Sequence, residues 1–133
     1  MATIRAYTTI EQSRKLAGIL PIESADMYWR SLNLNGHISW SSHIKRLEPP
    51  IYDLEYYIPC WSLASLLGVL PNNKHISTTL SRGGWKIEPI EYVDNWWCEY
   101  EDEIHTKNFS TSADNPVDAC YEMIIKLHEL NLL

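Results

Sequence analysis

The segment at residues 114–133, DNPVDACYEMIIKLHELNLL, constrains the fold more than any other part of the chain. It predicts an amphipathic helix, because Asn115 is a residue type that caps helices and Pro116 suits the first helical position. Apolar side chains, which we expect to be mostly buried, then recur at helical spacing: Val117, Cys120, Tyr121, Ile124 and Leu127. Such a helix needs an apolar surface to pack against, so the rest of the chain must build a packed domain.

Length and composition favour one globular domain that spans residues 1–133. The chain has 133 residues, of which 45% are hydrophobic, and a chain of that length buries roughly two thirds of its unfolded surface. Its three cysteines lack the spacing and the histidine partners of a zinc site, so we predict no metal, no cofactor and a reducing compartment. No apolar run is long enough for a signal peptide or a membrane span, which predicts a cytoplasmic protein with no membrane partner.

The first half of the chain is predicted to hold a helix and a hairpin. Thr8 and Glu11 form a capping box for the helix, and Gly18 is placed to end it. Asn35 and Gly36 lie between two strand-like runs, and both residue types tolerate the positive φ of a tight hairpin turn.

A second helix is predicted to open at Ile58-Pro59 and to end at Pro71, after a short extended piece at residues 52–56. Cys60 would then lie at the start of this helix. The residues expected to share its buried face are Cys60, Leu63, Ala64 and Leu67.

The second half of the chain reads as sheet. Strands are predicted at HISTTL (75–80), WKIEPIEY (85–92), NWWCEYE (95–101) and IHTKNFSTS (104–112), with a turn at residues 81–84 between the first two. The expected order is α-β-β-(β)-α-β-β-β-β-α. This is an α+β fold in which helices pack on one face of an antiparallel sheet and the C-terminal helix is docked on that sheet.

An acidic segment between Ile87 and Glu103 is the main candidate for an interaction surface. It contains no Lys or Arg, and strand alternation sends Trp97, Glu99 and Glu101 to one face. The candidate residues are Glu88, Glu91, Asp94, Trp97, Glu99, Glu101, Asp102 and Glu103. A solvated face and a functional acidic surface both explain this pattern. The net charge of −6 argues against direct nucleic-acid binding.

Two further features leave alternatives open. Cys60 at a helix start could be an activated nucleophile of a cysteine-dependent enzyme, or a buried cysteine beneath Trp61. The six Trp and eight Tyr, against one Phe, suit half-buried sheet positions or an aromatic binding surface. A homodimer is therefore also expected, with Trp29, Trp40 and Trp85 as interface aromatics.

Four segments occur together and in order: TTIEQSRKLAGIL, SADMYW, IPCWSLASLLGVLP and NPVDACYEMIIKLHEL. Together they resemble a family of short uncharacterised proteins of phages, prophages and mobile elements from gut anaerobic bacteria. The resemblance implies a small accessory protein and carries no catalytic residues. We therefore expect a non-enzymatic protein that acts through contact with an unknown protein partner. The alternatives are an acidic nucleic-acid mimic that inhibits a host DNA-binding protein and a cysteine-dependent enzyme that uses Cys60.

Overall fold

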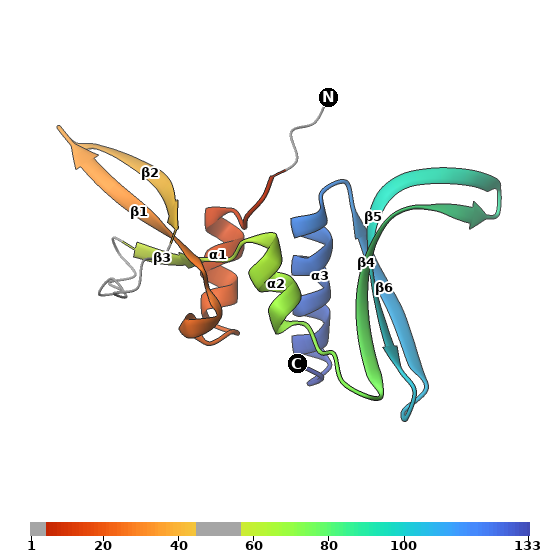
Figure 1. The fold of residues 1–133 in the computed structure, drawn as a ribbon. Helices are drawn as coiled ribbons and strands as arrows, with labels where there is room; N and C mark the ends of the chain where they lie inside the picture. The colour runs from red at the N-terminus through yellow and green to blue at the C-terminus, as the bar shows by residue number, and fades with distance from the viewer. Residues whose placement is uncertain (1–4, 45–56) are drawn as a thin grey trace. The chain divides into compact units, whose positions relative to one another are not determined.

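The computed structural model describes residues 5–44 and 57–133 and has the predicted α+β fold (Figure 1). In these residues it holds two three-stranded antiparallel sheets and three α-helices. The chain divides into two compact units, of which one comprises residues 6–68 and the other residues 1–5 and 69–133. The single domain at 1–133 stays a prediction, and the extended piece at 52–56 lies outside the described residues. Within the described ranges, no helix is long and apolar enough to cross a membrane.

The unit of residues 6–68 pairs one sheet with short helices. Its elements are α1 (Ile10–Ala17), the 3-10 helix η1 (Ile22–Ser24), β1 (Met27–Leu34), β2 (His37–Ile44), β3 (Tyr57–Cys60) and α2 (Leu63–Val69), whose last residue passes the boundary. The strand order is β2-β1-β3. Asn35 and Gly36 form the predicted hairpin turn with φ of 54° and 80°, and Leu34 pairs with His37 across it.

The capping box of α1 was predicted one residue too early. Thr9, not Thr8, is the N-cap, and its side chain accepts a hydrogen bond from the Gln12 N–H at 3.1 Å while Gln12 Oε1 accepts one from the Thr9 N–H at 3.0 Å. Thr8 is instead fully buried, where its hydroxyl contacts Ser13 Oγ at 2.7 Å and accepts a hydrogen bond from the Trp61 N–H at 3.2 Å. Gly18 ends the helix as predicted.

The start of α2 was also predicted too early. Pro59 and Cys60 belong to β3, where they pair with Tyr28 and Met27 of β1, so the helix begins only at Leu63. The predicted buried face of the helix is therefore wrong. Cys60 is buried as part of β3 and does not belong to the helix. Leu63 is half-buried and Ala64 and Leu67 are exposed, whereas Leu66 and Leu70 are buried.

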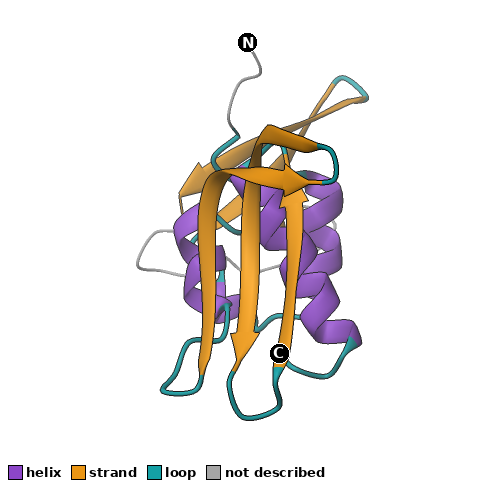
Figure 2. Cartoon of the chain, turned by 90° about the vertical axis from the view of Figure 1, so that its right-hand side faces the viewer, coloured by secondary structure: helices purple, strands orange, loops and turns teal. Residues whose placement is uncertain are grey.

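The unit that contains residues 69–133 is a sheet with one helix on it. Its elements are β4 (Ile76–Ile87), β5 (Ile90–Asp102), β6 (Lys107–Ala113) and α3 (Pro116–Glu129), with the strand order β4-β5-β6. Figure 2 views these three strands from the side opposite α3, which we call the outer face of the sheet.

The turn predicted at residues 81–84 is absent from this unit. β4 runs straight through it, and the pairing register shifts between Arg82 and Gly84 as at a β-bulge. Gly83 has φ of +78°, which glycine adopts at a bulge as easily as in a turn. The chain reverses instead at Glu88-Pro89, a cis peptide bond, so the two strands predicted at 85–92 and 95–101 become parts of β4 and one long β5.

Helix α3 forms and packs as predicted. The Asn115 side chain accepts a hydrogen bond from the Val117 N–H at 2.9 Å, and Pro116 is the first helical residue. Four of the five α3 residues that we expected to be buried are buried, and the fifth, Tyr121, is half-buried. The buried residues are Val117, Cys120, Ile124 and Leu127. The hydroxyl of Thr111 in β6 donates to the Ala119 carbonyl at 2.8 Å, which ties the helix to the sheet.

Candidate functional site

The β4–β5 hairpin extends beyond the third strand of its sheet. β6 pairs with β5 only from Trp96 to Asp102, so residues 84–95 form a two-stranded ribbon, here called the arm. The arm curves away from α3 (Figure 1). Among the described residues its two strands pair only with each other, which leaves backbone donors and acceptors on both edges open to another chain.

One face of the arm is apolar and exposed. Trp85 pairs with Tyr92 and Ile87 with Ile90 across the strands, so all four side chains share a face. Their exposed fractions are 72% for Trp85, 55% for Tyr92, and 80% for each isoleucine. The two rings meet edge to face with centroids 5.6 Å apart. Contiguous exposed apolar side chains mark interaction sites more often than isolated ones do.

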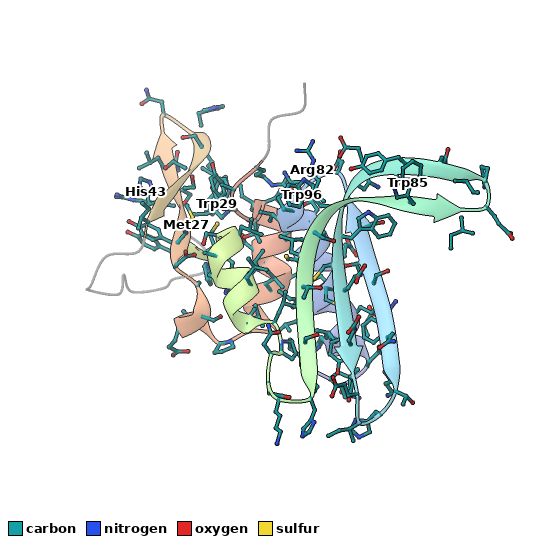
Figure 3. The ribbon with its side chains drawn as sticks, turned by 45° about the vertical axis from the view of Figure 1, so that its right-hand side comes forward. Met27, Trp29, His43, Arg82, Trp85 and Trp96 are labelled. Carbon is teal, nitrogen blue, oxygen red and sulfur yellow. The ribbon has the colours of Figure 1, made fainter. Side chains whose placement is uncertain are left out.

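The base of the arm is held by a charged contact on the same face. Arg82 donates hydrogen bonds to the Asp94 carboxylate at 3.1 and 3.3 Å, and its guanidinium lies 5.7 Å from the centre of the Trp96 ring. Figure 3 shows Arg82 beside Trp96 where the arm leaves the sheet, with Trp85 further along the arm. An exposed ion pair of this kind contributes about 0–1 kcal/mol, so it orients the base more than it stabilises the fold.

The bulge at Gly83 and Gly84 allows close contacts on both faces of the sheet. A Cβ atom at Gly83 would lie 1.8 Å from the Tyr92 hydroxyl oxygen, so the tyrosine packs directly on the glycine backbone. A Cβ atom at Gly84 would lie 3.5 Å from Nε1 of Trp97, which is an ordinary contact.

A hollow of about 690 Å³ lies on the outer face, at the base of the arm. Its lining includes Gly84, Glu91, Val93, Trp97, Glu99 and Ser110. The Nε1 atom of Trp97 is buried and has no hydrogen-bond partner among the described residues. Pockets of about 300–1,000 Å³ with a few convergent polar groups are typical ligand sites.

The acidic segment is divided by strand alternation, as predicted. Glu99 and Glu101 are exposed on the outer face with the half-buried Trp97, whereas Trp96 lies on the face toward α3. Glu91 also lines the outer hollow. Glu88 in the β4–β5 turn and Glu103 after β5 are both exposed.

Two of the predicted surface acids have other places. Asp94 pairs with Arg82 on the opposite face. Asp102 is only 2% exposed and accepts hydrogen bonds from the backbone N–H groups of Ile104 and His105 at 3.0 and 3.1 Å and contacts Nδ1 of His105 at 2.9 Å. The contacts with the His105 side chain and backbone hold the pKa of Asp102 below its usual value. Asp102 therefore closes the loop between β5 and β6.

Cys60 is fully buried at the end of β3 rather than exposed at a helix start. Burial raises the pKa of its thiol, and its Sγ lies 3.5 Å from Thr8 Oγ1. Cys98 and Cys120 are also buried and free. Thiols in such surroundings are poor nucleophiles. Within the described residues, no group of three or more His, Cys, Asp or Glu could hold a metal ion.

The interface aromatics predicted for a homodimer differ in exposure. Trp85 is exposed on the arm, whereas Trp29 and Trp40 are half-buried within the other unit. Trp29 donates its indole N–H to the Thr8 carbonyl at 3.2 Å, and Trp40 lies 5.7 Å from the Arg14 guanidinium. Only Trp85 is thus presented on an open surface.

The comparisons with known proteins return no relative: no family model, no curated protein and no solved structure matches this chain. The candidate site therefore depends on the geometry of the arm and the outer face. Sequence reasoning missed Ile87, Ile90 and Tyr92 as functional residues, because it placed the hairpin turn at 81–84. The signal that could have found them is the Glu88-Pro89 pair between two apolar β-branched residues.

Proposed function

We propose that this protein is a non-enzymatic protein-binding module that contacts its partner through the arm. The observation that carries the proposal is the exposed apolar face of Trp85, Ile87, Ile90 and Tyr92 on a ribbon that extends beyond the third strand. Interface cores are enriched in aromatic and aliphatic anchors of this kind. The buried state of all three cysteines favours binding over thiol catalysis.

The open strand edges add a second mode of contact. A partner strand can pair with the backbone of the arm while its side chains cover the apolar face, as in β-strand addition. Each apolar side chain that becomes fully buried on contact gains about 1.5–3 kcal/mol relative to full exposure, which offsets the cost of association.

The acidic nucleic-acid mimic is less well supported as a proposal. A mimic needs carboxylates spread at close spacing over one surface, since DNA carries one charge per about 1.7 Å of its axis. Here Asp102 is buried and Asp94 is paired with Arg82 on the other face, so the outer face retains only part of the segment. A cytoplasmic location fits the three free thiols, and an accessory role in a phage or mobile element fits the resemblance.

A second copy of this chain is the simplest partner for the arm. The two open edges of one arm can pair with those of another, and the apolar faces would then cover each other. Sedimentation velocity should show a dimer at tens of micromolar, which the replacement of Ile87 and Ile90 by Ser should dissociate. A mass of 15.5 kDa for the native chain under these conditions would contradict self-association and leave a foreign partner.

The general proposal is tested by affinity capture from a lysate of a gut anaerobe, the source that the resemblance implies. The bait is the native chain, the I87S/I90S variant, or Ile38→Ser as a matched control, since Ile38 in β2 is also 60% exposed. We expect the native chain and the Ile38 variant to capture the same partner proteins. The I87S/I90S variant should fail to capture them. Equal recovery by all three baits would exclude the arm as the contact surface.

A further inference from the structure

We propose that the outer hollow receives a cationic segment of the partner protein, with an arginine side chain seated between Glu99 and Trp97. This inference rests on the proposed function, because it assigns a chemistry to the segment that reaches the sheet beside the arm. The arm supplies an apolar contact with the partner. The hollow beside it selects a partner segment that carries positive charge.

Glu99 lines the hollow, and Glu101 lies two residues further along the same strand face. Neither of these two carboxylates pairs across the strands with a cationic residue. The residues paired with Glu99 are Thr79 and Ser110, and those paired with Glu101 are Ser77 and Asn108. Because Glu99 and Glu101 are two residues apart on one strand face, their charges repel each other. Glu91, which also lines the hollow, already has an interaction of its own, so the cation is assigned to Glu99. A cation bound to Glu99 in the hollow would relieve this repulsion.

Trp97 makes arginine the best match for the charge. Its indole lies on the same face as Glu99, two residues away along β5, and both line the hollow. A guanidinium forms paired hydrogen bonds with a carboxylate and stacks on an aromatic ring with its planar face, which a lysine ammonium does less well. Cation–π contacts contribute about 0.5–2 kcal/mol, more as the site loses water.

The size of the hollow fits a peptide segment rather than a bare ion. Its volume of about 690 Å³ is in the range of sites for small organic ligands. The rest of the lining is small or neutral, with Gly84, Val93 and Ser110 around the carboxylates. A neutral sugar could also stack on an indole, and the experiment below distinguishes the two.

The test is an NMR titration of the full chain with a synthetic Gly-Arg-Arg-Arg-Gly peptide. The indole N–H signal of Trp97, assigned with the Trp97→Phe variant, and the backbone signal of Glu99 should shift on binding. The matched variants are Glu99→Gln and Glu103→Gln, which remove the same charge from exposed sites. Loss of one charge-assisted contact should weaken binding about tenfold in the Glu99 variant. The Glu103 variant should bind as the native chain does.

Three results would overturn the inference. They are no shift with the arginine peptide, equal weakening by Glu99→Gln and Glu103→Gln, and a shift of Trp97 with a neutral oligosaccharide but not with the peptide. The second result would mean general attraction to the acidic chain. If the peptide does not bind but the arm variant still loses its partner, only the proposal for the hollow is refuted. If the arm variant keeps its partner, the proposed function is refuted, whether or not the peptide binds.

Discussion

Replacement of Gly83 by Ala tests the bulge that shapes both the arm and the hollow. Gly83 has φ of +78°, and a Cβ atom there would lie 1.8 Å from the hydroxyl oxygen of Tyr92. An alanine therefore meets two obstacles, a backbone conformation that L-residues rarely adopt and a side chain that already occupies the space. Tyr92 is 55% exposed, so its ring can swing away, but it then loses its contact with Trp85.

The two costs can be worked out separately. A left-handed conformation costs an L-residue roughly 1–2 kcal/mol. The edge-to-face contact of Tyr92 with Trp85 is worth about 0.5–1.5 kcal/mol. We therefore expect Gly83→Ala to lower the free energy of unfolding by about 2–3 kcal/mol.

Gly84→Ala is the matched control at the neighbouring position. Its φ is not positive, and its Cβ would meet Trp97 Nε1 at an ordinary 3.5 Å. Alanine at a compatible glycine position stabilises by about 0.4–1 kcal/mol, because it restricts the unfolded chain. Urea unfolding followed by circular dichroism should thus show opposite signs for the two variants. Equal losses of stability would refute the bulge geometry and, with it, the contact between Gly83 and Tyr92.

Three further predictions concern the core, the β5–β6 loop and the thiols. Ile124→Asp should lower the free energy of unfolding by about 3–5 kcal/mol, because it places an unpaired charge at a fully buried site. The control Glu122→Ala, at an exposed position of the same helix, should leave the free energy of unfolding almost unchanged. An unchanged melting temperature for Ile124→Asp would contradict the packing of α3. Because the folded state lowers the pKa of Asp102, its carboxylate stabilises the fold above the unfolded pKa of about 3.9, and this effect disappears as the pH falls through the folded pKa. The urea midpoints of the native protein and the Asp102→Asn variant should therefore differ near neutral pH and converge in acid. A difference that stays constant with pH would count against the role of His105. A thiol reagent should modify the three cysteines only after unfolding, and rapid labelling of native Cys60 would revive the cysteine-dependent enzyme.

The elements that could be predicted from the sequence are those with local signals. The Asn115-Pro116 pair and the helical spacing up to Leu127 lie within one segment, so α3 and most of its buried face could be predicted. Asn35-Gly36 is equally local, because the turn requires positive φ from adjacent residues. Strand alternation likewise separates Trp96 from Trp97 without any knowledge of the tertiary fold.

The errors arose where a distant partner decides the structure. Pro59 and Cys60 become a strand because Tyr28 and Met27 pair with them, and no pattern near Cys60 announces this. Asp102 was taken for a surface acid for another reason: its partners Ile104 and His105 are only two and three residues away, but the acidic pattern around it gives no sign that its carboxylate turns inward to close this loop. At Pro59 and Cys60 a contact outside the segment thus overrode the local preference.

Gly83-Gly84 was ambiguous for a different reason. Positive φ suits a hairpin turn and a bulge equally well, and only the pairing of Trp85 with Tyr92 selects the bulge. The hollow could not be predicted for the same reason, since it forms where the sheet curves at this bulge. Its residues could be assigned to one face, but their grouping around a concave site could not.

The arm and the hollow have different chemistry because of one alternating strand. β5 sends Ile90 and Tyr92 to one side of the arm and Glu91 and Val93 to the other, so the same ribbon presents an apolar face and a wall of the acidic hollow. Apolar contacts depend weakly on salt and mainly set how slowly a complex dissociates, whereas exposed charges are screened and mainly set how fast it forms. A partner that uses both faces would therefore be attracted through the hollow and retained by the arm. In the proposed complex, the charge of the outer face would favour the approach of cationic partners, and the apolar face would slow their dissociation.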